Sequence, residues 1–244
     1  MKLSRFDHRT EAILLNPEVS TALSHLTTIL ESTPVPYWLG KSQKQATKSV
    51  LQPVLNTFIE QELLAAGWER EVRVTGGSDG MHGMCVDFAR QIGNRLMVVE
   101  VQFGNVGRTY SDFHKFEHLQ MEGRLAVAIL VTLRHDTAVL TDSGIATFET
   151  SVRRIEEVKN TIFKAIPVPL VCLGLSHQDA PLVDFSRSRF ADAKVLSGTG
   201  AKADIAHAVS ALRSGTPIED VGPRVVIDTA RKPTSQQGQL SLLL

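Results

Sequence analysis

The sequence contains few cysteines, few aromatic residues and no long apolar run. Its two cysteines, Cys85 and Cys172, lie far apart in apolar, strand-like segments, which favours buried free thiols over a disulfide. No stretch of about 18 apolar residues predicts a membrane span, and the first residues do not resemble a signal peptide. We therefore expect a cytoplasmic, intracellular protein of bacterial type that does not bind membranes.

The chain also has no excess of charge of either sign, because 26 basic residues balance 26 acidic ones. Composition alone therefore neither indicates nor excludes a nucleic-acid partner, since local clusters of Lys and Arg decide such binding. Two Trp and two Tyr are too few for a platform that stacks single-stranded bases. The glycine-rich segment 75–83 lacks the Gly-Lys-Ser/Thr ending of a phosphate-binding loop, so we expect no nucleotide cofactor.

What the chain does contain is a regular alternation of helix and strand patterns. Apolar residues recur at helical spacing after Asn16-Pro17 and after Pro53, and the period then changes to that of strands. This order predicts an α/β fold with a central mixed β-sheet flanked by helices. The expected strands are 70–75, 84–91, 95–103, 126–132 and 168–174, and the expected later helices are 110–122 and 146–164.

Gly93-Asn94 separates two of these strands and predicts a two-residue hairpin turn of type I′ or II′. With that turn, Asp87 faces Glu100 across the hairpin, and Gln102 lies on the same face. Cross-strand partners have Cβ atoms about 4.5–5.5 Å apart, so two carboxylates and an amide converge. An alternative interpretation remains open, in which these polar residues simply face solvent.

Two like charges opposite each other destabilise a sheet, and here they interrupt otherwise apolar strands. A divalent cation would neutralise both. Mg²⁺ is suited to such a site, because it takes one or two carboxylates and keeps several waters. The backbone carbonyl of Val101 is a further candidate ligand beside Asp87 and Glu100. The pattern therefore predicts a Mg²⁺ site that could act on a phosphodiester.

Asp87, twelve further residues and then Glu100-Val101-Gln102 resemble the PD-(D/E)xK nuclease motif, with glutamine in place of the usual lysine. The chain resembles the type II restriction endonucleases of the BglII and BstYI group in particular. Further blocks agree in order over about residues 50–175, namely LLAAGWERE, VEVQFGN, DFHKF, EGRLAVAILVT and VPLVCLGL. The resemblance implies a restriction-endonuclease-like core in a single nuclease domain spanning 1–244. The irregular C-terminal region 176–244 would add DNA or dimer contacts.

By this resemblance, Asp87 and Glu100 hold the metal and Gln102 helps to position the attacking water. Because the motif lysine is missing, no obvious general base occupies its place. Activation of the water would then rest on the metal and on the scissile or a neighbouring phosphate. An accessory acidic residue is expected before the hairpin, with Glu71 favoured and Glu69 as the alternative.

The resemblance also implies where DNA is contacted. Asn and Arg can pair bidentately with adenine and guanine in the major groove, whereas phosphate contacts position the protein without specifying sequence. We expect base contacts from Asn105 and Arg108, phosphate contacts from Lys115 and His114, and a second reading loop with Asp142 and Ser143. For each of these residues, an ordinary place on the surface is the alternative.

These observations predict a homodimeric, Mg²⁺-dependent type II restriction endonuclease that cuts both strands of a short palindromic site. A two-fold symmetric dimer matches such a site. The resemblance implies a GATC core and 5′ overhangs. The alternatives are a PD-(D/E)xK nuclease for repair or modified DNA, and an inactive DNA-binding relative. An intact set of Asp87, Glu100 and Gln102 argues against the last.

Overall fold

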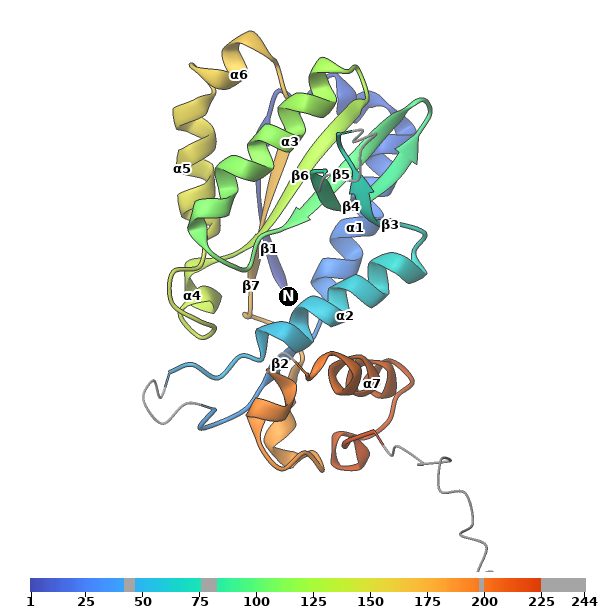
Figure 1. Ribbon diagram of the computed structural model, residues 1–244, viewed down its shortest axis with the longest axis vertical. Coiled ribbons are helices and arrows are strands. Elements are labelled where there is room, and N and C mark those ends of the chain that lie inside the picture. The colour runs from blue at the N-terminus through green and yellow to red at the C-terminus, as the bar shows by residue number, and fades with distance from the viewer. Residues whose placement is uncertain (42–46, 76–82, 198–199, 225–244) are drawn as a thin grey trace, which may run out of the picture.

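The computed structural model describes residues 1–41, 47–75, 83–197 and 200–224, and a six-stranded mixed sheet forms its centre (Figure 1). The glycine-rich loop at 76–82 and the C-terminal tail at 225–244 lie outside the described residues. No helix in the described ranges is long and apolar enough to cross a membrane. That residues 1–244 form a single nuclease domain stays a prediction.

The sheet has the strand order β1-β7-β6-β5-β4-β3. The central strands β5, β6 and β7 run parallel, whereas β1 pairs antiparallel with β7 and the β3–β4 pair continues the other edge antiparallel. The predicted α/β fold with a mixed central sheet is confirmed. The bounds are β1 Lys2–His8, β3 Glu69–Arg73, β4 Cys85–Ile92, β5 Arg95–Val101, β6 Leu125–Leu133 and β7 Leu170–Ser176.

Helices cover both faces of this sheet, which explains why every residue of β6 and β7 is buried. One apolar core joins the sheet to α1 and α2, and a second joins its other face to α3 and α5 (Figure 1). The bounds are α1 Pro17–Ser32, α2 Gln52–Ala65, α3 Thr109–Met121, α4 His135–Ala138, α5 Phe148–Val158 and α6 Ile162–Ala165.

The region predicted to be irregular after residue 176 contains ordered elements. β2 (Val35–Tyr37) pairs in parallel with β8 (Leu182–Asp184). The segment after β8 and helix α7 (Lys202–Arg213) build a third apolar core against the start of α2. Most elements of this unit are short, but α7 has 12 residues with Ile205, Ala208 and Val209 buried at helical spacing, a signal that the sequence analysis missed. Figure 1 shows it beneath α2, at a distance from the sheet. Short 3-10 helices complete the chain at Ile13–Leu15, Val106–Arg108, Phe185–Arg187, Ala193–Leu196 and Ile218–Asp220.

Candidate active site

Of the predicted active-site residues, Asp87 and Glu100 lie on the β4–β5 hairpin, Gln102 follows β5 directly, and Glu71 lies on β3. The turn of the hairpin is as expected: Ile92 pairs with Arg95, and Gly93 has φ of 55°. Because no positive φ occurs at Asn94, the turn is of type II′. The register continues regularly from the turn to the Phe88–Val99 pair, and there the two strands part.

Asp87 and Glu100 are therefore neighbours where the strands separate, and the expected ladder pair between them does not form. Asp87 instead accepts a hydrogen bond from the Val101 N–H, with 2.9 Å between Oδ2 and the nitrogen. This side-chain bond replaces a ladder bond at the end of the hairpin. Beyond the parting point β5 keeps its pairing with β6, through Glu100–Leu130 and Val101–Val131. The result is an open end of the sheet at which one acid is half-buried and the other is buried.

Glu100 is the buried acid, with 3% of the residue exposed. The pKa of Glu100 is raised to about 9, first by burial and then by the nearby Asp87 and Asp112, against the opposing effect of Lys115. Asp87 is half-buried. Negative charge is therefore crowded at the end of β5, where an added cation would be favoured.

Two residues of α3 complete this cluster. The Lys115 Nζ lies 2.8 Å from Glu100 Oε1 and 3.1 Å from Asp112 Oδ1. The sequence analysis predicted Lys115 as a phosphate contact and missed Asp112 entirely. A signal was present, because Asp112 falls at helical spacing with the buried Phe113, Phe116 and Leu119, on the face that turns inward.

These groups line a cleft of about 320 Å³, which we call the Lys115 cleft. Gln102 is buried in it, and its Nε2 donates to the Asn105 carbonyl at 3.0 Å. The glutamine that replaces the motif lysine thus holds the loop in which base contacts are expected. The cleft is lined by Asp87, Glu100, Val101, Gln102, Arg108, Ser111, Asp112 and Lys115.

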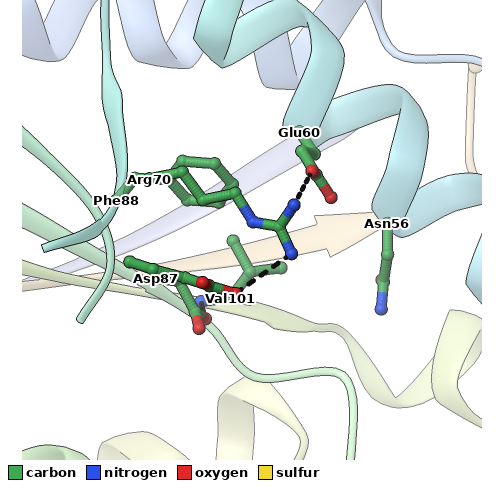
Figure 2. A pocket seen from close by; sticks show the side chains of 7 residues that line it. Asn56, Glu60, Arg70, Asp87, Phe88 and Val101 are labelled. Atoms are coloured by element: carbon green, nitrogen blue, oxygen red, sulfur yellow. Dashed lines mark hydrogen bonds and ion pairs between the residues drawn. The ribbon is translucent and has the colours of Figure 1, made fainter. Parts of the chain in front are cut away.

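A second cleft of about 200 Å³ meets the first at Asp87 and Val101. We call it the Arg70 cleft, and Figure 2 shows the Arg70 side chain reaching toward Glu60 of α2, with Asp87 and Val101 close by. Its ion pairs are more exposed than those of the Lys115 cleft. The cleft is lined by Asn56, Glu60, Arg70, Glu71, Asp87, Phe88 and Val101.

Glu71 lies in this cleft beside Asp87, on a distorted part of β3. Arg70 pairs with Phe88 and Val72 with Val86, but Glu71 between them is left out of the ladder. Its φ is 52°, a left-handed conformation that costs energy for a residue with a Cβ. Glu69, the alternative, is exposed opposite Ala89 and lines neither cleft. Sequence reasoning did not single out Asn56 and Glu60, which lie one turn apart on α2 and line the cleft with Glu71.

The two expected base-reading loops lie side by side. The Ala146 N–H donates to the Gly104 carbonyl and the Val106 N–H to the Gly144 carbonyl, each at 3.1 Å. Asn105 is exposed between these bonds, and its Oδ1 accepts from the Gly107 N–H at 2.8 Å. Asp142 and Ser143 are exposed at the second loop, whereas His114 is exposed on α3 and lines neither cleft.

The candidate metal ligands are few. In the part of the chain that the structure describes, no three His, Cys, Asp or Glu side chains are grouped so that they could hold an ion by themselves. The available donors are two carboxylates, Asp87 and Glu100, and backbone oxygen at Val101. All are oxygens, and one or two carboxylates with retained water is the set that Mg²⁺ commonly uses.

The sheet, its flanking helices and the acids at the parted hairpin define a nuclease of the restriction-endonuclease-like class. The family model described as restriction endonuclease BglII/BglIII matches residues 5–175, and the chain belongs to this family. It is a type II restriction endonuclease. The match begins far before residue 50, so that β1 and α1 are part of the family core.

The structure is similar to the crystal structure of restriction endonuclease BglII complexed with a DNA 16-mer. The TM-score is 0.61 at 19% sequence identity, over 80% of this chain and 87% of that one. This likeness confirms the fold. A comparison with curated proteins gave no match.

Proposed function

We propose that this restriction endonuclease uses Mg²⁺ to cut both strands of a short palindromic DNA site with a GATC core, leaving 5′ overhangs. The observation that carries the proposal is the pair of carboxylates, Asp87 and the buried Glu100, at the point where the hairpin strands part. The raised pKa of Glu100 supports a cation there, because burial and the nearby Asp87 and Asp112 disfavour its ionised form more than Lys115 favours it.

In this proposal Asp87, Glu100 and the Val101 carbonyl hold the metal. A divalent cation bound there lowers the pKa of water and stabilises charge on a phosphodiester. Gln102 positions the attacking water and keeps the Asn105 loop against the site. Glu71 acts as the accessory acid from the Arg70 cleft. The family relationship supports a divalent metal in general, and the oxygen-only donor set favours Mg²⁺.

The reaction is hydrolysis of one phosphodiester bond in each strand. The oxygen of water forms a bond to phosphorus, and the bond from phosphorus to the leaving oxygen breaks. The water loses a proton to the solvent, and the leaving oxygen gains one. Each cut therefore consumes one water molecule and needs no nucleotide cofactor.

Sequence recognition is assigned to the two joined loops. Asn105 and Arg108 read base edges, Asp142 and Ser143 contribute from the second loop, and His114 and Lys115 contact phosphate. The exposure of the loops and the backbone bonds between them support this assignment, because a rigid pair of loops can enter one groove together. A homodimer would present two such units to the two halves of a palindrome.

The deciding experiment is incubation of the purified chain with a fully sequenced plasmid and Mg²⁺, followed by sequencing of the ends. We expect every cut at one recurring palindrome with a GATC core and a staggered 5′ end. The Asp87→Ala protein, purified in the same way, serves as the control for contaminating nucleases. Ends without a common sequence, or cutting by the control, would contradict the proposal. Light scattering of the free protein tests the homodimer separately.

A further inference from the structure

Lys115 is placed with its ammonium group between two buried carboxylates. Its Nζ bonds to Glu100 at 2.8 Å and to Asp112 at 3.1 Å, and only 15% of the lysine side chain is exposed. Asp112 and Lys115 are three residues apart on α3, so both reach the same end of β5. The ammonium group is therefore fixed within the cleft that Asp87 also lines.

A purely stabilising role does not explain this arrangement. Buried ion pairs contribute little net stability, because desolvation of the charges offsets their attraction. In addition, Asp112 Oδ2 is buried and has no hydrogen-bond partner in the described part of the chain. An unsatisfied buried oxygen destabilises the folded protein, and a catalytic or binding role is one reason for which such an atom is retained. Asp112 lines the same cleft as the two proposed catalytic acids, Asp87 and Glu100.

Gln102 stands where the PD-(D/E)xK motif usually has a lysine, so the positive charge of that lysine is missing from the site. Gln102 is neutral, and its Nε2 donates to the Asn105 carbonyl. Of the described residues that line the Lys115 cleft, Arg108 and Lys115 are the cations, and Arg108 is exposed in the loop. Lys115 is thus the cation held inside, in contact with Glu100.

We propose that Lys115 is a catalytic residue of this nuclease, whose ammonium group contacts the scissile phosphate and stabilises the negative charge that develops there. The proposal rests on the active site proposed above and goes beyond the phosphate contact expected for this lysine. Asp112 is a positioning residue that keeps the ammonium in place. Lys115 keeps its proton and forms no bond, so the hydrolysis is balanced as before: one water oxygen joins phosphorus and one oxygen leaves.

A lysine near phosphate can act in catalysis or in DNA binding, and its removal affects the cleavage rate in the first case and the DNA affinity in the second. Removing one pre-positioned group that stabilises transition-state charge lowers a rate by about 10²–10³. Removing a contact made for binding alone weakens DNA affinity, and it reduces the dependence of affinity on salt by about one counterion. The cleavage rate of bound DNA, compared with affinity, therefore separates a catalytic lysine from an anchoring one.

The test uses the full chain and a duplex that carries the site mapped for the wild type. Lys115→Met is compared with Lys159→Met, which removes a lysine from an ion pair of the same helical spacing on α5. Three quantities are measured: the single-turnover rate at saturating Mg²⁺, the affinity for the duplex in EDTA, and Mn²⁺ binding by calorimetry. We expect K115M to cut about 100-fold more slowly, with affinity reduced less than about tenfold and Mn²⁺ binding no weaker. K159M should match the wild type, and Lys115→Arg should recover part of the rate.

Asp112→Asn tests the positioning role, because it leaves the lysine and removes the charge that holds it. We expect a rate about tenfold below the wild type with unchanged DNA affinity, since a misplaced group loses part of its effect. If K115M does not melt cooperatively, the double variant D112N/K115M removes the charge of one of the two carboxylates that the lysine bonds to, and its rate should fall as predicted for K115M.

Three results would overturn the proposal while leaving the proposed function intact. The first is that K115M, or the double variant in its place, cuts within about threefold of the wild-type rate. The others are that the cleavage rate and the DNA affinity fall in parallel, or that Mn²⁺ binding weakens together with the rate. A wild-type protein that leaves every plasmid site uncut overturns the proposed function itself, and this proposal with it.

Discussion

The Lys115 cleft and the Arg70 cleft meet at Asp87, but the charged side chains are buried in the first and exposed in the second. In the Lys115 cleft, Glu100 and Asp112 have side chains only 5% and 6% exposed. In the Arg70 cleft, Glu71 is 71% exposed and the Arg70 side chain 37%. Exposed ion pairs contribute little, whereas a buried charge without full compensation has a large effect on energy. We therefore expect catalysis to be concentrated in the Lys115 cleft, with the Arg70 cleft in a supporting role.

The largest effect should come from the acids at the junction. Asp87→Ala or Glu100→Ala should reduce Mg²⁺-dependent cleavage by at least about a thousandfold, because a bound metal would stabilise the transition state by several kcal/mol. Gel assays on plasmid DNA measure the loss, and circular dichroism checks that folding is spared. Normal cutting by either variant would remove that residue from the site.

Asn105→Ala tests whether the Lys115 cleft, through Gln102, is tied to base reading. We expect the preference for the cognate site over a site with one altered base to fall by about 1–3 kcal/mol, the value of one bidentate contact. Competition cleavage between the two duplexes measures it. Gly104→Ala, at which an added Cβ meets no atom within 4 Å, changes the same loop without touching the Asn105 side chain and is the comparison. An unchanged preference for N105A would exclude Asn105 from the readers.

Glu100→Gln should raise the stability of the metal-free protein, although it abolishes cutting. Because the pKa of Glu100 is raised from an ordinary 4.5 to about 9, the ionised form is less favourable in the folded state. The resulting loss of folding stability is absent at or below about pH 4.5 and grows as the pH rises toward 9. Between these values the unfolded chain binds fewer protons at this residue than the folded chain does.

In EDTA at pH 8, E100Q should therefore melt higher than the wild type, by about 2–4 °C for each kcal/mol removed. At pH 5 the difference should nearly vanish. Thermal melts at both values measure it. A lower melting temperature for E100Q at pH 8 would show that the bond from Lys115 outweighs the burial of the carboxylate.

The smallest effect is expected in the Arg70 cleft. Glu71→Gln should slow cleavage by about three- to tenfold and leave DNA binding nearly unchanged, because the side chain is exposed and screened by water. Glu69→Gln, two residues away on the same strand and outside both clefts, is the matched control. If E71Q instead weakened binding more than cleavage, Glu71 would have no part on the metal side, and the contrast between the clefts would be sharper still.

Much of the fold was predictable because strand and helix periods are strong in the middle of the chain. The predicted helix at 110–122 is α3 at Thr109–Met121, and the strand at 126–132 is β6 at Leu125–Leu133. β1 was missed, because this edge strand is only half-buried and its alternation is weak. The helix expected over 146–164 is split into α5 and α6, with a turn between them.

The sequence by itself determined the hairpin and the grouping of Asp87, Glu100 and Gln102 at its open end. A two-residue turn sets the register of the strands that it joins, and a period of two residues assigns each side chain to a face. These relations are local, so they can be derived without knowledge of the rest of the chain. The structure corrected one detail, the direct pairing of the two acids, because the Asp87 bond to Val101 ends the ladder early.

Only the tertiary structure decided what surrounds those acids. Helix α3 lies on one face of the sheet and brings Asp112 and Lys115 to the end of β5, while α2 and β3 form the Arg70 cleft beside Asp87. No spacing in the sequence predicts these contacts, because they depend on how helices pack across a sheet rather than on a repeat along one element. Burial, which raises the pKa of Glu100 and fixes Lys115 against it, is likewise a property of the packed protein.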